Sequence, residues 1–191
     1  MSNNQSQPMQ VLTSSESNSW YTPIHVIEMV REVLGEIDLD PASHPVPQRW
    51  IQANTYYTEQ DDGLKYDWSC YTLFLNPPYG KTGTRSNQDI WAEKLSIACR
   101  ASKIYSGAIL LTKTVPGYKW WDNLFNGGWP GPCSITRDRL SFVRGNVDML
   151  PTDKTGKSKA ASTFWYYGAD PELFNKVFSE IGRVIPPGDL Y

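Results

Sequence analysis

The feature that most constrains the fold is the run YTLFL, residues 71–75, which leads directly into Asn76, Pro77, Pro78 and Tyr79. The run is too short for a helix and shows no alternation of apolar and polar residues, so it predicts a strand buried on both faces. Proline fixes φ and lacks a backbone N–H, and two prolines in succession therefore end the strand. A strand buried on both faces favours an α/β domain with helices covering the sheet.

Helical and strand patterns alternate along most of the chain. Thr22 as N-cap, Pro23 at the first helical position and Gly35 at the end predict a helix over residues 24–35. A short helical turn is expected within residues 44–60. Further helices are predicted over residues 89–102, 117–125 and 171–182, and strands over 36–40, 71–75, 106–115, 134–143 and 161–168. This order predicts an open, mostly parallel sheet with helices on both faces, and its last two strands are close enough to pair.

We expect one domain over residues 20–191, preceded by a disordered tail over residues 1–19. The tail is rich in Ser, Asn and Gln and lacks the basic start and apolar stretch of a signal peptide. The whole chain of 191 residues is 40% hydrophobic and 20% charged, as in ordinary soluble globular proteins. No apolar run reaches the length of a membrane span, so a cytoplasmic protein without membrane attachment is expected.

The cysteines and histidines do not form a metal-binding pattern. Cys70, Cys99 and Cys133 are well separated and match no CxxC spacing, and the two histidines, His25 and His44, lie neither at i, i+4 nor beside a cysteine. We therefore expect reduced cysteines and no metal site.

The charges are sorted along the chain. Residues 1–80 carry 3 Lys/Arg and 10 Asp/Glu, whereas residues 81–159 carry 13 Lys/Arg and 6 Asp/Glu. This segregation indicates that the middle of the chain meets an anion. The alternative is that charges are scattered by chance over a solvated surface.

Two unusual segments follow directly on predicted strands. Asp40-Pro41-Ala42-Ser43 follows one and Asn76-Pro77-Pro78-Tyr79 follows another. Ligands of open α/β sheets bind outside the carboxyl ends of the strands. If the two strands are neighbours, a carboxylate, an amide and an aromatic ring line a single cleft.

The Asn-Pro-Pro-Tyr segment combines rigid hydrogen-bond acceptors with an aromatic plate. The Asn76 side-chain oxygen and the Pro77 carbonyl could accept both N–H bonds of an aromatic amine such as that of adenine, which favours a pyramidal nitrogen with its lone pair toward an electrophile. Aiming the reactants in this way can supply about 7–11 kcal/mol of barrier reduction. Tyr79 would stack on the base. The alternative is an Asn-Pro turn with a packing tyrosine.

Five segments, WYTPIHVIEMV, IDLDPAS, DDGLKYDW, LFLNPPYG and DRLSF, occur in the order found in the phage-type DNA N6-adenine methyltransferase family, which the chain resembles over about residues 20–168. The resemblance implies a Rossmann-like methyltransferase sheet and S-adenosylmethionine as methyl donor, with S-adenosylhomocysteine as product. It also implies adenine in DNA as acceptor, reached by base flipping, and is compatible with a phage- or prophage-encoded protein in the bacterial cytoplasm.

The resemblance assigns roles position by position. The catalytic place falls on Asn76, Pro77, Pro78 and Tyr79, and the cofactor segments fall on Tyr21, Thr22, Pro23, Asp40, Pro41, Ala42, Asp61 and Asp62. Asp62 is preferred over Asp61 as the acid near the cofactor's adenine. The bland alternatives are a turn cap for Asp40, a solvated loop for Asp61 and Asp62, and a hydrophobic staple for Tyr21. About 35 residues separate Asp40 from Asn76, which leaves little room for a second strand, and the ribose-binding acid has no assignment.

The basic block supplies candidate phosphate contacts. They are Lys81, Arg85, Arg137, Arg139, Arg144, Lys154, Lys157 and Lys159. Arg139 could instead pair with Asp138 or Asp122. The expected partner is duplex DNA, read by loops over about residues 81–88 and 144–160, and a homodimer would add surface. A methyltransferase acting on a protein glutamine amide and a non-catalytic nucleic-acid-binding relative remain as alternatives.

Overall fold

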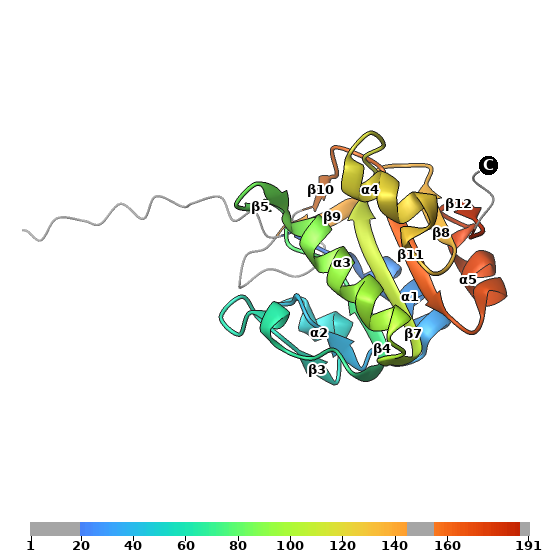
Figure 1. Cartoon of the computed structure of the whole chain (residues 1–191). Helices are drawn as coiled ribbons and strands as arrows, with labels where there is room; N and C mark the ends of the chain where they lie inside the picture. Colours follow the sequence, from blue (N-terminus) through green and yellow to red (C-terminus); the bar gives the residue numbers. More distant parts are fainter. Residues whose placement is uncertain (1–19, 145–154, 188–191) are drawn as a thin grey trace, which may run out of the picture.

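A computed structural model describes residues 20–144 and 155–187, which are built around a seven-stranded sheet (Figure 1). The strand order is β12-β8-β11-β7-β4-β2-β3. In that order the strands are β12 (Gly182–Ile185), β8 (Cys133–Thr136), β11 (Ser162–Gly168), β7 (Ile104–Lys113), β4 (Cys70–Leu75), β2 (Leu39–Asp40) and β3 (Thr55–Tyr56). The expected tail, residues 1–19, lies outside the described residues.

The prediction of a mostly parallel sheet is wrong. The pairs β3–β2, β2–β4 and β4–β7 are parallel, but β7–β11, β11–β8 and β8–β12 are antiparallel. Because β11 runs opposite to both of its neighbours, strand pairing changes from parallel to antiparallel between β4–β7 and β7–β11. The expected pairing of the two late strands is confirmed, because β8 and β11 are neighbours.

Helices cover both faces of the sheet, as predicted. The helices α1 (Ile24–Leu34) and α5 (Pro171–Phe178) contribute to one core cluster with Phe74, Ile109 and Phe164. The helices α3 (Asn87–Arg100) and α4 (Lys119–Asn123), with the π-helical segment η2 (Leu124–Gly128), contribute to a second cluster with Leu75 and Leu110. In Figure 1, α3 crosses in front of β4 and β7, and α1 lies behind β7.

Two smaller sheets flank the carboxyl edge of the main one. The first has the order β1-β9-β10, and the second is a hairpin of β5 and β6. Their strands are β1 (Trp20–Tyr21), β9 (Ser141–Arg144), β10 (Thr155–Lys157), β5 (Lys81–Thr82) and β6 (Arg85–Ser86). The single strand expected over residues 134–143 is therefore wrong: its first half is β8 of the main sheet and its second half is β9 of the small sheet.

Other local predictions need correction. Pro23, not Thr22, is the N-cap of α1, and no side chain caps that helix. The final helix ends at Phe178, and residues 182–185 form β12 instead of helix. A second strand does fit between Asp40 and Asn76, because β3 needs only two residues. The expected turn within residues 44–60 is confirmed as α2 (Gln48–Ile51).

All three cysteines are buried and free, and burial raises the pKa of each thiol to about 12. Within residues 20–144 and 155–187, no group of three His, Cys, Asp or Glu side chains could hold a metal ion. In the same ranges, no helix has the length and apolar character to cross a membrane.

Candidate functional site

The two strand-end motifs lie at one edge of the sheet. The strands β2 and β4 are parallel neighbours, with Leu39 opposite Leu73. Since parallel strands end at the same edge, Asp40 at the end of β2 and Asn76 just after β4 both lie at that edge. The two segments that were predicted to line a single cleft therefore lie at one edge of the sheet.

The Asn76 amide is oriented by the segment before α1. Its Nδ2 donates to Thr22 Oγ1 at 3.1 Å and to the Trp20 carbonyl at 3.5 Å. Thr22 is buried, with 1% of its surface exposed. These contacts use the amide nitrogen, so the side-chain oxygen of Asn76 remains the acceptor that faces away from them.

The segment that holds Thr22 is in turn tied to α2 and to the turn after β2. Trp50 Nε1 donates to the Thr22 carbonyl at 2.8 Å. The Tyr21 ring stacks on His44 with centroids 5.8 Å apart and makes an edge contact with Trp50. The Tyr21-Thr22 segment and the Asp40 turn, two separate parts of the chain predicted to hold the cofactor, therefore form one cluster.

Asp40 is a buried carboxylate, with 2% of its surface exposed. Its oxygens accept from the Ala42 amide at 3.3 Å and from Gln48 Nε2 at 2.9 Å. Burial raises its pKa to about 6, and hydrogen bonds from Ser43, Ala42 and Gln48 oppose that rise. No ion pair joins it to a cation in the described ranges, so its negative charge is met only by neutral donors.

The acidic loop predicted to approach the cofactor's adenine packs against this turn. Asp61 is exposed and accepts from the Thr58 amide at 2.8 Å and its hydroxyl at 2.7 Å, hydrogen bonds that lower its pKa. Asp62 has φ 56° and lies 3.5 Å from Lys65 Nζ. A Cβ at Gly63 would overlap the Pro41 carbonyl. That close approach places Asp62 next to the Asp40-Pro41 turn, whereas Asp61 serves its own loop.

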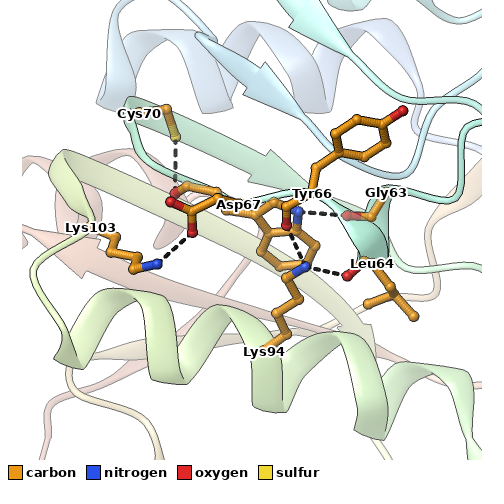
Figure 2. A network of polar contacts seen from close by, with 8 residues as sticks. Gly63, Leu64, Tyr66, Asp67, Cys70, Lys94 and Lys103 are labelled. Atoms are coloured by element: carbon orange, nitrogen blue, oxygen red, sulfur yellow. Dashed lines mark hydrogen bonds and ion pairs between the residues drawn. The ribbon is translucent and has the colours of Figure 1, made fainter.

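Lys94 braces the turn η1 (Gly63–Lys65) that follows Asp62 (Figure 2). Trp68 supports the same turn. Lys94 Nζ reaches from α3 and donates to the carbonyls of Leu64 and Tyr66, each at 2.6 Å. Trp68 Nε1 donates to the Gly63 carbonyl at 2.9 Å, and Lys94 Nζ lies 4.5 Å from the Trp68 ring centroid. Sequence reasoning missed both residues. Lys94 in particular has the sequence pattern of a solvent-exposed lysine on an amphipathic helix.

Tyr79 has a cationic neighbour that sequence reasoning also missed. Lys113 Nζ lies 4.2 Å from the centroid of the Tyr79 ring. Both side chains are half-buried, and burial raises the pKa of the Tyr79 phenol to about 12. Tyr79 therefore stays neutral, with one face of its ring covered by a lysine.

The hairpin after Tyr79 is anchored to α3. The side-chain Nδ2 of Asn87 donates to the Tyr79 carbonyl at 3.2 Å, and its backbone N–H donates to the Gly80 carbonyl at 3.0 Å. Arg85 pairs with Asp89 at 2.8 Å and Glu93 at 2.9 Å. The guanidinium of Arg85 therefore fixes the hairpin to α3.

The other predicted DNA contacts differ in their surroundings. Arg137 donates to the carbonyls of Glu180 and Ser179 at 3.2 and 3.0 Å, which fixes it to the end of α5. Arg139 is exposed, and no ion pair joins it to Asp138 or Asp122 in the described ranges. The remaining exposed candidates are Lys81, Lys157 and Lys159. The Arg144 side chain and Lys154 lie outside what the structure describes.

Comparison with known proteins agrees with the resemblance seen in the sequence. A family model described as DNA N-6-adenine-methyltransferase (Dam) matches residues 10–174. A search of curated proteins finds no match. The matched range covers most of the chain and includes both strand-end motifs, the acidic loop and β9. The chain therefore belongs to the DNA N-6-adenine-methyltransferase (Dam) family.

Proposed function

We propose that this protein transfers a methyl group from S-adenosylmethionine to the N6 amine of adenine in duplex DNA. The observation that carries the proposal is the Asn76 amide at the carboxyl edge of the sheet. Its nitrogen is bound by Thr22 and Trp20, and its oxygen is left for a ligand. Membership of the Dam family supports the choice of adenine in DNA over a protein glutamine amide.

The cluster around Asp40 fits the donor. S-adenosylmethionine supplies a methyl group made electrophilic by the sulfonium charge, and it also carries an ammonium group. A buried carboxylate without a cation, such as Asp40, would be stabilised by either positive group. We assign Tyr21, Thr22 and Pro23 to the methionine end, Asp40, Pro41 and Ala42 to the turn beside it, and Asp62 to the adenine end.

The Asn-Pro-Pro-Tyr segment fits the acceptor. Asn76 Oδ1 and the Pro77 carbonyl accept the two N–H bonds of the adenine amine, and in the described ranges no hydrogen bond ends on the Pro77 carbonyl. Each oxygen is the negative end of a C=O dipole, and both dipoles stabilise the positive charge that develops as the nitrogen gains its methyl group. The adenine must leave the duplex to reach them, and it would stack on Tyr79.

The first experiment tests the acceptor side. Purified protein is incubated with DNA and S-adenosylmethionine, and N6-methyladenine is measured by mass spectrometry of the nucleosides. We expect product from the wild type and about a 100-fold lower rate from Asn76→Ala, because one of two oriented dipoles is lost. Asn123→Ala, on the exposed side of α4, serves as the control that keeps wild-type activity.

Two results would contradict the proposal. One is the absence of N6-methyladenine with folded wild-type protein. The other is an Asn76→Ala variant that methylates DNA at the wild-type rate. A thermal shift assay separates the donor from the acceptor: S-adenosylmethionine at 100 times its Kd should stabilise the wild type by about 2.7 kcal/mol, and Asn76→Ala should keep most of that shift.

A further inference from the structure

Lys113 lies at the carboxyl end of β7, on the face of the sheet that carries Asn76. Leu75 pairs with Leu110, so Asn76 is level with Leu111, and Lys113 lies two residues further toward the edge. Successive side chains of a strand alternate between faces. Leu111 contributes to the same core cluster as Phe74, whereas Leu75 and Leu110 contribute to the other. Alternation therefore places Lys113 and Asn76 on one face.

Lys113 is a half-buried cation that forms no ion pair with a carboxylate of the described residues. Its Nζ lies over the Tyr79 ring, 4.2 Å from the ring centroid. Burial lowers its pKa, and the nearby Lys159 lowers it further. None of the ion pairs in the described ranges includes Lys113 or Lys159. A partly desolvated cation with a second cation near it is unfavourable until an anion binds between or beside them.

We propose that Lys113 binds a backbone phosphate of the DNA strand that carries the target adenine. The inference rests on the proposed function, since it presumes that DNA reaches Tyr79. A phosphodiester brings a negative charge, which no ion pair of the described residues supplies to Lys113, and charge-assisted hydrogen bonds to it are strong. Because Lys113 covers one face of the Tyr79 ring, the adenine stacks on the opposite face.

The experiment measures how DNA affinity depends on salt. The probe is a fluorescein-labelled duplex with one adenine opposite an abasic site, because an unpaired base flips at low cost. Binding is followed by anisotropy over a series of salt concentrations. Each phosphate contact contributes about 0.9 to the slope of log K against log salt. We expect Lys113→Met to reduce the slope by about that amount, and Lys113→Arg to retain it.

Lys103→Met is the matched control. Lys103 directly precedes β7, whereas Lys113 ends that 10-residue strand, so the two lysines lie about 30 Å apart. Lys103 pairs with Asp67 at 2.5 Å, away from Asn76. Its removal should leave the slope unchanged. Methionine keeps the apolar stem of lysine, and a thermal melt of each variant shows that it folds.

The outcomes separate this inference from the proposed function. If the wild type methylates DNA and Lys113→Met keeps the full slope, the phosphate assignment is wrong and the proposed function stands. If Lys113→Met instead loses affinity for S-adenosylmethionine with an unchanged slope, the anion is the donor's carboxylate and the assignment is again wrong. If the folded wild type neither binds nor methylates the duplex, both proposals fail.

Discussion

At the scale of single residues, we expect the buried carboxyl of Asp40 to make the stability of the protein depend on pH. Burial raises its pKa from 3.8 to about 6. Between these values the folded protein keeps a proton that the unfolded chain releases, so the free energy of unfolding falls as pH rises through this window. Above pH 6 the ionised carboxylate destabilises the free protein by about 3 kcal/mol. We propose that donor binding relieves this penalty, because the positive groups of S-adenosylmethionine would lie near the ionised carboxylate.

Asp40→Asn tests this linkage. We expect the variant to be more stable than the wild type at pH 8, by about 1 kcal/mol. The gain stays below the full penalty because the new Nδ2 opposes Gln48 Nε2, which now donates to the carboxylate at 2.9 Å. Near pH 4, where the wild-type carboxyl is protonated and its penalty is gone, the contact with Gln48 remains and the variant should be less stable than the wild type by about 2 kcal/mol. Denaturant unfolding at the two pH values measures it, and equal stability differences at both would contradict the account.

Donor affinity should follow the same titration. We expect wild-type binding of S-adenosylmethionine, measured by calorimetry, to weaken as pH falls below 6, and Asp40→Asn binding to be weaker and insensitive to pH there. His44 is a second ionisable side chain in this cluster, where it stacks on Tyr21. His44→Asn is therefore the control: if this variant loses the pH dependence, the histidine and not Asp40 is responsible.

At the scale of elements, the brace formed by Lys94 and Trp68 should control how well the Asp62 loop is held. Lys94→Met removes two hydrogen bonds to loop carbonyls. Their loss should cost about 1–2 kcal/mol, which we expect to appear as about a tenfold higher KM for S-adenosylmethionine with little change in kcat. Lys103→Met is the control, because its Nζ pairs with Asp67 and not with those carbonyls. A tenfold fall in kcat of Lys94→Met, with KM unchanged, would contradict a role confined to holding the Asp62 loop.

Elements with strong local patterns could be predicted from the sequence, and those defined by tertiary contacts could not. The helix α1 and the strands β4 and β7 have clear periodicity or apolar runs. The split between β8 and β9 is hidden because the turn after Thr136 contains neither Gly nor Pro, and Arg137 makes that turn by binding carbonyls at the end of α5. The direction of β11 is equally hidden, since β9 and β10 intervene between it and β8.

The candidate site divides in the same way. The Asn-Pro-Pro-Tyr and Asp-Pro-Ala segments are contiguous, so their chemistry and placement at strand ends could be inferred from the residues. Lys94 and Lys113 act on segments 28 to 34 positions away in the chain, and no local spacing marks them. Nothing in the sequence indicates that the Thr22 hydroxyl accepts a hydrogen bond from Asn76 and so orients its amide.

At the scale of the whole molecule, the three-stranded sheet β1-β9-β10 joins two late strands, β9 and β10, to Trp20 and Tyr21 at the start of the domain. Strand β1 pairs with β9, and Tyr21 lies opposite Val143. A Cβ at Gly156 in β10 would overlap the Trp20 ring. We expect Gly156→Ala to displace Trp20, to disturb the Asn76 amide that it helps to hold, and to lower the methylation rate about tenfold with a smaller effect on Tm.

A double-mutant cycle tests this coupling. Phenylalanine lacks the outer indole atoms that would overlap the new methyl group, so Trp20→Phe should restore most of the activity lost in Gly156→Ala. Additive losses in the double mutant would show that the two residues act independently. The measurement is the initial rate of N6-methyladenine formation in all four proteins.

The lengths of the outermost strands bear on how copies of this protein associate. Strand β3 has two residues and β12 has four, so two copies meeting border to border would gain few backbone hydrogen bonds. A homodimer remains a prediction, and we expect it to use surfaces other than β3 and β12 and to leave the carboxyl edge with Asn76 and Lys113 accessible to DNA.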